Sequence, residues 1–505
     1  MSYDPQYMSH VELRKAAAAV GSGILTALAM PGFGWAPLLF VGLVPLFYAL
    51  ESKHRFLYGL LFGATFFALD QRWILTVYRF SPLVVPGFLL LVLYLSLYTG
   101  VFGMLVRPVR GRPFGPGLLL AAPAFLTLLE IARAQGPLGT GFSSLYHALY
   151  RMPWAIQLAP VLGPWGITAL VVLVNAGLYL ALRRRRAVYL LASVFAIVLL
   201  AGSSLLPIAP DEGEPLRVAI VSSDVKQEVK LDARNLEALA NRYETLGQEA
   251  LAAKPDLIVF PESILPTFIL SDLDILARLT RIATAGEANV LFGTGVYENR
   301  QIRNTVVLLS DRGEVHGEYA MVRPVPFGEY IPWRSLWEAI GLKRLMDSFL
   351  PVDLTPGTSF EPLDGIGTPI CFESTFPGPA RAFARNGAGI LAIVTNDAWF
   401  VGSSELVAHF SAAVLRAVET RRYVIQSANG GISGLVDPRG RILATTDGER
   451  ALSGEVHKRD DMTPYARWGD VPLVLVLAVA GAGFLVVEVR RRRRPSLTPP
   501  NANGG

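Results

Sequence analysis

The sequence predicts a bundle of about eight membrane-spanning α-helices joined to one α/β domain, and three observations lead to that class. The 505-residue chain has a mean hydropathy of +0.40 and only 17% charged residues, which is too apolar for a soluble enzyme of this size. Apolar runs of about 20 residues, the length that a helix needs to cross a bilayer, lie before residue 210 and recur once near the end. Between them, short strand-like runs alternate with amphipathic helical stretches.

The membrane part is predicted from the position of the long apolar runs. The predicted spans are 17–33, 35–51, 56–78, 82–106, 115–134, 162–182, 187–206 and 470–489. The first run has no small-residue cleavage site and is followed at once by the second, so we expect it to be retained rather than removed as a signal peptide.

Basic residues predict how the spans are oriented. They gather at Arg14 and Lys15, at Lys53 and Arg55, at Arg107, Arg110 and Arg112, at 183–186 and at 490–494. Because loops on the cytoplasmic side keep an excess of Lys and Arg, both termini are predicted to be cytoplasmic. The sequence pI of about 9.2 could also suggest nucleic-acid binding. Each basic run adjoins a hydrophobic span, however, which favours membrane anchoring and no nucleic-acid partner.

These assignments divide the chain into four parts. The predicted parts are a seven-helix transmembrane region at 1–206, an extracytoplasmic domain at 207–468, an eighth span at 469–490 and a basic, disordered cytoplasmic tail at 491–505. The large domain is expected to lie in the periplasm or its equivalent, on the outer side of a bacterial inner membrane.

The domain at 207–468 has the alternating pattern of an α/β fold. Strands are predicted at Leu216–Val225, DLIVFPES (256–263), NVLFGTGVYE (289–298), NTVVLLSDRG (304–313), TPICFES (368–374) and LAIVTND (391–397). Helices are predicted at Glu237–Lys254, Asp272–Glu287, Pro379–Asn386 and Ala408–Arg422.

Three polar residues are predicted to lie where a strand meets a loop, the usual place for catalytic groups in α/β domains: Glu262, Cys371 and Glu373. Taken singly, such a glutamate is more often a solvated loop residue, and a lone cysteine is more often an inert core thiol. Cys371 is the only cysteine, which excludes an intramolecular disulfide, and the six histidines have no metal-ligand spacing. No metal or cofactor is therefore predicted.

Taken together, four motifs favour a catalytic role for these residues. FPES, PVPFGEYIPW, ICFES and TNDAWF, in this order, resemble the nitrilase superfamily of carbon-nitrogen hydrolases. That resemblance implies a four-layer αββα sandwich and a Glu, Lys and Cys triad. In such a triad the thiol is the nucleophile, and a carboxylate with a nearby cation draws away its proton.

The membrane part narrows the resemblance further. ALAMPGFGWAPLLFVGLVPLF, IQLAPVLGPWGITALVVLVNAGL and the late segment GISGLVDPRGRIL resemble the apolipoprotein N-acyltransferase family over nearly the whole chain. The resemblance implies that Glu262 is the base, Cys371 the nucleophile, and Glu329 and Glu373 supporting residues. It also implies a phospholipid acyl donor, a thioester intermediate and a diacylglyceryl apolipoprotein as acceptor. A monomer is expected.

One departure from the family pattern concerns the triad itself. The stretch YAMVRPVPFGE places Met321 at the position of the family lysine, and Arg323 and Lys343 are the nearby basic residues. Smaller departures are Phe372 in place of a common tyrosine and Leu231 in place of a tryptophan after a matching Lys230. Methionine fills the volume of a lysine stem without its charge, so the sequence predicts a folded but impaired enzyme. Two alternatives stay open here: a catalytically silent protein that binds lipid or lipoprotein, and a membrane-tethered amidase.

Overall fold

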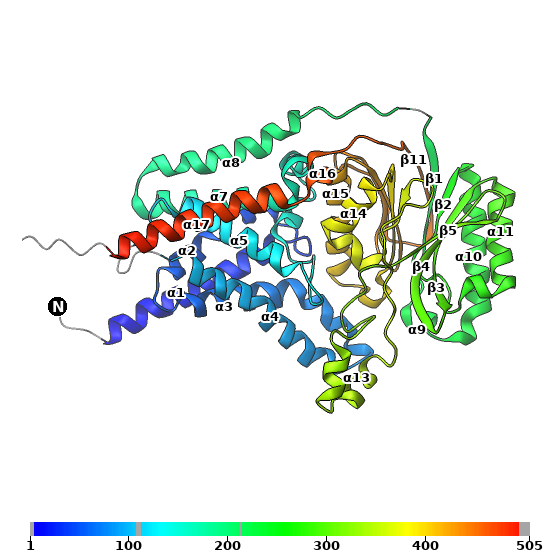
Figure 1. The fold of residues 1–505 in the computed structure, drawn as a ribbon, viewed down its shortest axis with the longest axis horizontal. Coiled ribbons are helices and arrows are strands. Elements are labelled where there is room, and N and C mark those ends of the chain that lie inside the picture. Colours follow the sequence, from blue (N-terminus) through cyan, green and yellow to red (C-terminus); the bar gives the residue numbers. More distant parts are fainter. Residues whose placement is uncertain (1–4, 108–112, 213, 494–505) are drawn as a thin grey trace, which may run out of the picture.

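The protein is built in two parts that follow one another along its long axis. The computed structural model describes residues 5–107, 113–212 and 214–493. Figure 1 shows helices side by side in one half and two β-sheets with their covering helices in the other. Of the basic residues used to predict orientation, Arg110, Arg112 and Arg494 lie outside the described residues.

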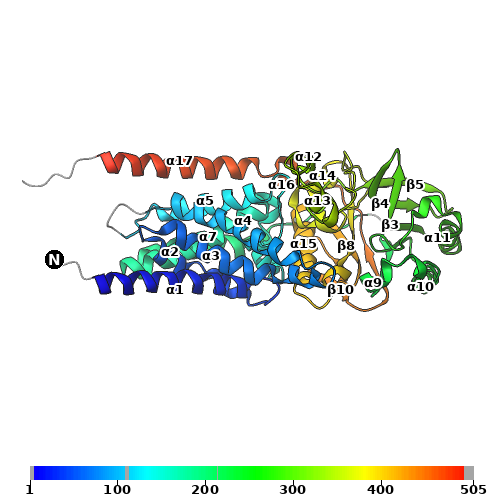
Figure 2. The same cartoon turned by 90° about the horizontal axis from the view of Figure 1, so that it is seen from below.

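The first part is a bundle of long apolar helices that run along the axis (Figures 1 and 2). Its α-helices are α1 (Pro5–Ala29), α2 (Val44–Leu50), α3 (Arg55–Asp70), α4 (Val84–Leu105), α5 (Leu118–Arg133), α6 (Pro153–Ile156), α7 (Ala159–Arg184), α8 (Leu190–Gly202) and α17 (Val471–Arg493). Short 3-10 helices connect them: η1 (Ala36–Phe40), η2 (Gln71–Arg79), η3 (Leu145–Leu149), η4 (Ala187–Tyr189) and η5 (Ser203–Leu205).

Five helical stretches among the described residues are long and apolar enough to cross a membrane, by length and composition alone. They are Arg55–Arg79, Val84–Leu105, Ala159–Arg184, Ala187–Leu205 and Val471–Glu488. Each coincides with a predicted span. The other three predicted spans correspond to α1, to η1 with α2, and to α5. The total of eight therefore stays a prediction.

Two of the predicted segments differ from the structure in detail. The span predicted at 35–51 is interrupted, since η1 ends at Phe40 and α2 begins at Val44, around Gly42. Glycine is a poor helix former, and proline favours the first turn of a helix, where Pro45 lies in α2. In contrast, α17 continues to Arg493, past the predicted start of the tail at 491, because arginine is a good helix former.

Three basic loops meet at the end of the bundle that is far from the sheets. The Glu51 carboxylate after α2 pairs with Arg183 at the end of α7 (Nε to Oε2, 3.1 Å) and accepts the Phe114 N–H at 3.0 Å. Arg184 donates from Nε to the Phe114 carbonyl oxygen at 2.8 Å. This arrangement agrees with the prediction that these loops lie on the same side of the membrane. Which side of the membrane they face stays a prediction.

The second part contains two sheets. The first has the strand order β11-β1-β2-β3-β4-β5, formed by β1 (Leu216–Ser222), β2 (Leu257–Val259), β3 (Asn289–Glu298), β4 (Gln301–Leu309), β5 (Val315–Ala320) and β11 (Arg450–Val456). The second has the order β10-β9-β8-β7-β6, formed by β6 (Ile366–Gly367), β7 (Ile390–Asn396), β8 (Tyr423–Asn429), β9 (Ser433–Val436) and β10 (Ile442–Thr446). The late segment GISGLVDPRGRIL supplies the antiparallel pair β9 and β10.

Helices cover the outer face of each sheet, which gives four layers. Helices α10 (Leu236–Ala250) and α11 (Leu273–Gly286) share an apolar core with the first sheet. Helices α14 (Pro377–Arg385) and α15 (Glu405–Thr420) cover the second sheet and lie between it and the bundle (Figure 1). The predicted α/β domain and its αββα layering are therefore confirmed.

The remaining short elements of this part surround the strand ends. They are α9 (Gln227–Lys230), η6 (Ala233–Asn235), η7 (Leu251–Ala253), η8 (Ile269–Ser271), α12 (Arg334–Ala339), α13 (Lys343–Phe349), η9 (Cys371–Thr375), η10 (Asp397–Phe400) and α16 (Pro464–Trp468). The strand predicted for TPICFES is wrong, because η9 occupies most of it. Cys371 has a φ of +46°, which a strand cannot contain.

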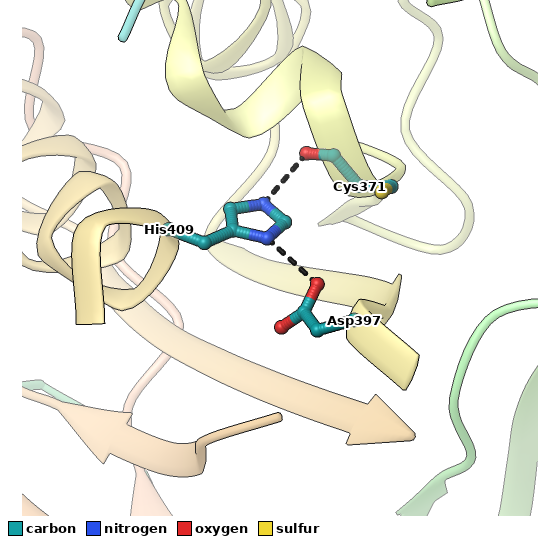
Figure 3. Close-up of side chains that lie close together, drawn as sticks. All are labelled: Cys371, Asp397 and His409. Atoms are coloured by element: carbon teal, nitrogen blue, oxygen red, sulfur yellow. Dashed lines mark hydrogen bonds and ion pairs between the residues drawn. The ribbon is translucent and has the colours of Figure 1, made fainter. Parts of the chain in front are cut away.

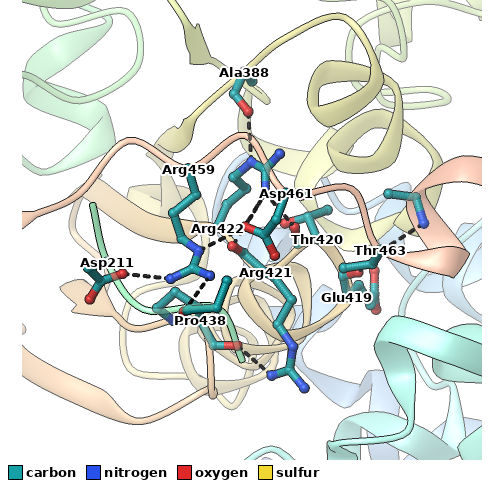
Figure 4. Close-up of polar contacts among 12 residues, drawn as sticks. Asp211, Ala388, Glu419, Thr420, Arg421, Arg422, Pro438, Arg459, Asp461 and Thr463 are labelled. Carbon is teal, nitrogen blue, oxygen red and sulfur yellow. Dashed lines mark hydrogen bonds and ion pairs between the residues drawn. The ribbon is translucent and has the colours of Figure 1, made fainter. Parts of the chain in front are cut away.

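A buried polar junction holds the linkers against the second part (Figure 4). Arg459 pairs with Asp211 of the incoming linker (Nη1 to Oδ1, 2.6 Å) and with Asp461. Arg422 donates to the carbonyl oxygens of Ala388 and Asp461. Both arginines are more than nine-tenths buried, so these bonds tie the chain entering from α8 and the chain leaving toward α17 to one place.

Candidate active site

Glu262 lies directly after β2, at the C-terminal ends of the parallel strands. Its side chain is 7% exposed, and Oε1 accepts a hydrogen bond from Nδ2 of Asn304 on β4 at 2.6 Å. Oε2 is buried and receives no hydrogen bond of normal geometry from the described residues. Gly293 of β3 allows the close approach, since a Cβ there would lie 2.6 Å from the Glu262 Cα. One oxygen of this carboxylate is therefore held, and the other is available.

Cys371 occupies a sharp turn where the chain leaves the second sheet. Ile370 still pairs with Val394 of β7, and η9 begins at the cysteine itself. The half-buried cysteine has a left-handed backbone with a φ of +46°, a conformation that costs free energy for any residue except glycine. Such strain is retained mainly at functional sites, where the surroundings hold it. The turn presents the only thiol of the chain next to the Glu262 carboxylate.

The charges around the thiol determine its resting state. Burial, with the negative charges of Glu262 and Asp397, raises the pKa of the Cys371 thiol well above its ordinary value. Burial also raises the pKa of Glu262, against the opposing effects of the Asn304 hydrogen bond and the Lys230 charge. The thiol therefore holds its proton at rest and needs a base when it attacks, and Glu262 is placed to accept that proton.

Met321 lies in this cluster, as the motif alignment predicts. Its side chain is 2% exposed, and its Sδ is 3.8 Å from Nδ2 of Asn304. The same amide nitrogen donates to Oε1 of Glu329 at 3.1 Å as well as to Glu262. The methionine therefore ends beside the amide that bridges two carboxylates. A lysine there would bring a positive charge to this point, and methionine brings none.

Glu329 is the second carboxylate at this amide. Its Oε2 accepts the Val325 N–H at 2.7 Å, which closes the PVPFGE turn. Burial and the neighbouring Glu262 charge raise the pKa of Glu329 to about 7. Because two close carboxylates cannot both ionise easily, this pair retains a proton at a higher pH than isolated carboxylates would, although the Lys230 charge opposes the effect at Glu262.

Glu373 holds the cysteine turn against the segment after β5. Its fully buried carboxylate accepts hydrogen bonds from the backbone N–H groups of Ile370, Val322 and Arg323 and from the Tyr319 hydroxyl, at 2.7 to 3.0 Å. Burial raises its pKa to about 7 in spite of these donors. Glu373 is therefore a supporting residue, since it joins the segments that carry Cys371 and Met321.

Lys230 ends the short helix α9 and points its ammonium group into the site. Its side chain is 5% exposed, and Nζ donates to the backbone carbonyl oxygen of Glu262 at 3.0 Å. Burial lowers the pKa of Lys230 to about 8, while the Glu262 and Cys371 charges act in the opposite direction. The lysine is thus charged at neutral pH and interacts with both residues of the candidate pair.

His409 of α15 lies behind the cysteine turn (Figure 3). Its Nε2 is 3.0 Å from the Cys371 carbonyl oxygen, and its Nδ1 is 2.9 Å from Oδ1 of Asp397. Both of these neighbours are acceptors, which favours a proton on each ring nitrogen and thus a positively charged ring, and the Ser374 hydroxyl lies 2.9 Å from Nε2 as well. Burial opposes this charge, but Asp397 and Glu405 raise the pKa of His409 well above its ordinary value.

Cys371, Asp397 and His409 also have the residue types of a metal site. Ligand atoms of Cys371, Asp397 and His409 lie within 4.8 Å of one another. Both imidazole nitrogens are committed to hydrogen bonds, however, and Figure 3 shows the cysteine sulfur at the end of the residue away from the ring. The cluster fits an ion pair that supports the turn better than a metal centre.

The two basic residues near Met321 in sequence have other surroundings. The Arg323 guanidinium lies over the Phe376 ring, 4.2 Å from its centroid. Lys343 is exposed on α13 and pairs with Glu338 (Nζ to Oε1, 2.9 Å). Among the described residues, neither side chain forms a hydrogen bond or ion pair with Glu262 or the Cys371 thiol.

The helical bundle contributes directly to the site. Phe142, from the loop after α5, packs against both Phe372 and His409, with 6.2 Å between ring centroids in each case. Arg79 at the end of η2 donates to the Ala398 carbonyl oxygen at 2.7 Å. The turn at Cys371 and its surroundings therefore pack against residues of the helical bundle.

A cavity of about 460 Å³ lies next to the cysteine turn. Tyr330 is part of its wall and donates to the Pro137 carbonyl oxygen of the bundle at 2.7 Å. The walls come from both parts of the chain: Gly136, Pro137, Gly139, Val322, Arg323, Pro324, Pro326, Tyr330, 353–356, Phe372 and Phe376. A substrate in this cavity would meet the bundle and the sandwich at once.

The structure brings together all five residues that the sequence singled out, Glu262, Met321, Glu329, Cys371 and Glu373. Sequence reasoning missed Asn304 and His409, and it noted Lys230 only as a match to a family position. A polar asparagine within the apolar strand NTVVLL was the one available signal for Asn304.

A carboxylate and a thiol held at the strand ends of an αββα sandwich, on an apolar helical bundle, define a membrane-embedded relative of the carbon-nitrogen hydrolases. Residues 217–456 match the family model described as carbon-nitrogen hydrolase, and residues 22–177 match the apolipoprotein N-acyltransferase N-terminal domain. The chain belongs to the apolipoprotein N-acyltransferase family. The predicted family and acyltransferase class are thereby confirmed.

Individual relatives match along nearly their whole length. The apolipoprotein N-acyltransferase of Geobacter metallireducens is 34% identical over 94% of this chain and 95% of its own. That of Thermotoga maritima is 30% identical over 95% of each. Among solved structures, an amidase from Nesterenkonia sp. is 20% identical, covering 54% of this chain and 98% of its own, with a TM-score of 0.38.

Proposed function

We propose that this protein moves an acyl chain from a phospholipid, through a thioester on Cys371, to the α-amino group of a diacylglyceryl-cysteine at the N-terminus of an apolipoprotein. The observation that carries the proposal is the Glu262 and Cys371 pair, built at the contact between a carbon-nitrogen hydrolase domain and the N-terminal domain of this acyltransferase family. The named relatives support the same reaction.

The proposed first half-reaction forms the thioester. Glu262 takes the thiol proton as the Cys371 sulfur attacks the ester carbonyl carbon of the phospholipid, and the S–C bond forms. The ester C–O bond then breaks, and the leaving alcohol of the lysophospholipid receives the proton from Glu262. The strained turn at Cys371 holds the sulfur beside the Glu262 carboxylate for this attack.

The proposed second half-reaction consumes the thioester. The neutral α-amino group of the acceptor attacks the acyl carbon, so that an N–C bond forms and the S–C bond breaks. Glu262 takes a proton from the attacking nitrogen and returns it to the Cys371 sulfur. One carboxylate can serve both steps because each step ends with its proton passed on.

The surroundings of the site favour amphiphilic substrates. The cavity beside Cys371 is bounded by the bundle on one side and by the PVPFGE segment on the other. Near that segment, Trp333, Leu336 and Ile340 are each more than half exposed, which is unusual for large apolar side chains in water. A lipid donor and a lipid-modified acceptor suit a cavity with such apolar surroundings better than small polar amides would.

The location that accompanies this function is a bacterial inner membrane. The chain would have both termini in the cytoplasm and the domain at 207–468 on the outer side, at the leaflet where lipoproteins are completed. The Lys and Arg distribution supports that orientation. We further propose that the protein acts as a monomer and without a cofactor, on membrane substrates rather than nucleic acid.

Two other functions fit these observations less well than the acyltransferase. A membrane-tethered amidase would need the sandwich but not a bundle that matches the acyltransferase N-terminal domain at 22–177. A silent lipid- or lipoprotein-binding protein was suggested by Met321, but Glu262, Asn304 and Cys371 retain an arrangement fit for catalysis. The acyltransferase is favoured over both.

The test uses the purified full chain in phospholipid vesicles. The donor is phosphatidylethanolamine with a labelled sn-1 chain, and the acceptor is a synthetic diacylglyceryl-cysteine peptide. We expect mass spectrometry to find label on Cys371 without acceptor and on the peptide amine with it, and Cys371→Ala to abolish both. Full peptide acylation by Cys371→Ala would refute the thioester route. Hydrolysis of simple amides without phospholipid dependence would favour the amidase.

A further inference from the structure

The site keeps two buried acceptors, Oε2 of Glu262 and Oδ1 of Asn304, that receive no hydrogen bond from an N–H or O–H group of the described residues. The Cys371 thiol, a weak donor, lies beside the Glu262 carboxylate. Both acceptors belong to the cluster in which Met321 replaces the family lysine. Buried polar groups without partners are rare and costly, so their presence here marks the place where a donor and a charge are missing.

A buried cation, Lys230, contacts the backbone of the same glutamate. Lys230 is 95% buried and donates from Nζ to the backbone carbonyl oxygen of Glu262, not to its carboxylate. Among the described residues this bond uses one of the three N–H groups of the ammonium. Two N–H groups are left for negative charge that develops near Glu262 or Cys371 during the reaction.

The backbone that carries Lys230 is fixed by a chain of buried amides. Gln227, one turn before it in α9, accepts from Nδ2 of Asn396 at 3.0 Å. Asn396 in turn accepts from Nδ2 of Asn429 at 2.8 Å, and Asn429 bonds both backbone groups of Val225. Strand ends of the second sheet therefore hold α9 in place. The lysine is positioned by the fold and does not reach in as a loose surface side chain.

We propose that Lys230 supplies the positive charge of the active site, standing in for the family lysine that Met321 replaces. Its ammonium stabilises the Cys371 thiolate as it forms and the oxyanion of the acyl intermediate that follows. The oxyanion role rests on the proposed acyl transfer, whereas the effect on the thiol does not. Lys230 interacts electrostatically with Cys371. A nearby cation favours the thiolate of a buried thiol, and burial strengthens that interaction.

The first measurement is independent of any substrate. Cys371 is the only cysteine, so the rate of iodoacetamide alkylation of the full chain at pH 7.5 reports the thiolate fraction directly. We expect Lys230→Met to slow alkylation about tenfold, which corresponds to one pKa unit of the thiol, and Lys230→Arg to retain most of the rate. The exposed neighbour Lys226 gives the matched control, since Lys226→Met removes a charge from the surface and should change nothing.

The decisive variant is Lys230→Met combined with Met321→Lys. If the role of Lys230 is its charge, the second substitution restores alkylation, because it returns a cation to the same cluster from the other side. Met321→Lys alone should alkylate at least as fast as the natural chain. The second measurement is acyl adduct formation on Cys371 with phosphatidylethanolamine vesicles. Lys230→Met should lower it about 100-fold, the usual effect of losing one oxyanion donor, and the double variant should regain it.

Three outcomes overturn the proposal. One is an alkylation rate within twofold of the natural chain in folded Lys230→Met. Another is a folded double variant that stays slow, since that would make the role of Lys230 packing rather than charge. The third is a loss that follows Arg323→Met instead. If no variant forms an acyl adduct while the alkylation pattern holds, the acyl transfer fails and the charge assignment stands.

Discussion

The Nε2 atom of His409 lies 3.0 Å from the carbonyl oxygen of Cys371, so a buried imidazolium holds the backbone of the candidate nucleophile. The other ring nitrogen, Nδ1, donates to Oδ1 of Asp397 at 2.9 Å and lies 3.4 Å from Oε1 of Glu405. This arrangement explains how a non-glycine residue keeps a left-handed conformation at the turn. The strain at Cys371 is offset by a charge-assisted bond to its own carbonyl group.

Replacing His409 should therefore destabilise the protein and the turn together. His409→Asn removes the cation and leaves Asp397 and Glu405 buried without it, which should cost about 3 to 5 kcal/mol of unfolding free energy near pH 6. Because the folded pKa of His409 is raised, its stabilisation is complete below the unfolded pKa and is lost as pH rises through the folded pKa. The difference in melting temperature should shrink toward alkaline pH. A pH-independent difference, or an equal effect from exposed His316→Asn, would contradict the charge assignment.

Glu373 should be essential for the structure of the site. Glu373→Gln places an NH₂ group where backbone N–H groups now point, so we expect a loss of about 2 to 3 kcal/mol, against about 1 kcal/mol for Tyr319→Phe, which removes a single donor. Thermal unfolding of the full chain in detergent measures both, with exposed Glu314→Gln as the matched control. Similar melting temperatures for Glu373→Gln and its control would contradict this role.

Activity should fall on the alkaline side as Lys230 loses its proton. Burial lowers the pKa of Lys230 to about 8, so the rate of acyl adduct formation should decline as pH rises through that value. Lys230→Arg should move this decline to higher pH, because a guanidinium keeps its charge. An unchanged alkaline limb in Lys230→Arg would assign the decline to another group.

The orientation of the chain can be tested by reporter fusions. Alkaline phosphatase, which is active only outside the cytoplasm, should be active when inserted in the exposed turn at Gly448 and inactive when fused after Arg494. A green fluorescent protein should give the opposite pattern. Phosphatase activity at the C-terminus would require a different number or direction of spans.

The sequence was sufficient for the architecture and for the residues carried by motifs. Long apolar runs and strand-like segments predict a bundle and a sandwich because hydropathy and periodicity reflect burial directly. Cys371 and Glu262 were found because each ends an apolar segment. The turn at Cys371 was mistaken for a strand. TPICFES is apolar enough for one, and the bonds from Glu373 and His409 that impose the turn come from outside that pattern.

The polar contacts between residues far apart in the chain could not be predicted from the sequence. Lys230 lies 32 positions before Glu262, and His409 lies 38 positions after Cys371. Neither spacing has local meaning, since tertiary folding alone brings these residues together. Arg323 and Lys343 are the basic residues near Met321 in sequence, but Arg323 packs over Phe376 and Lys343 lies on the surface. Proximity along the chain was a poor guide to the site's charge.

Restoring lysine at position 321 should shift the acid limb of the activity profile. Burial raises the pKa of Glu262, and it raises the pKa of Glu329 to about 7, with the neighbouring carboxylate adding to the effect on Glu329. An ammonium group beside Asn304 lowers both values, so Met321→Lys should reach full activity at a lower pH than the natural chain, while neutral Met321→Leu should keep the natural limb.

The same substitution has a stability signature whose sign follows from these shifts. Carboxyl groups with raised folded pKa values favour the folded state below their unfolded pKa and lose that contribution as pH rises through about 7. Above pH 7 the ionised pair has the Lys230 charge beside Glu262 in the natural chain and gains a further cation in Met321→Lys. Below about pH 4, where carboxyl groups are protonated, the new lysine is buried without a counter-ion. The melting temperature of Met321→Lys relative to the natural chain should therefore rise with pH. Parallel stability curves together with superimposed activity profiles would mean that the residue at position 321 does not affect the protonation of Glu262 and Glu329.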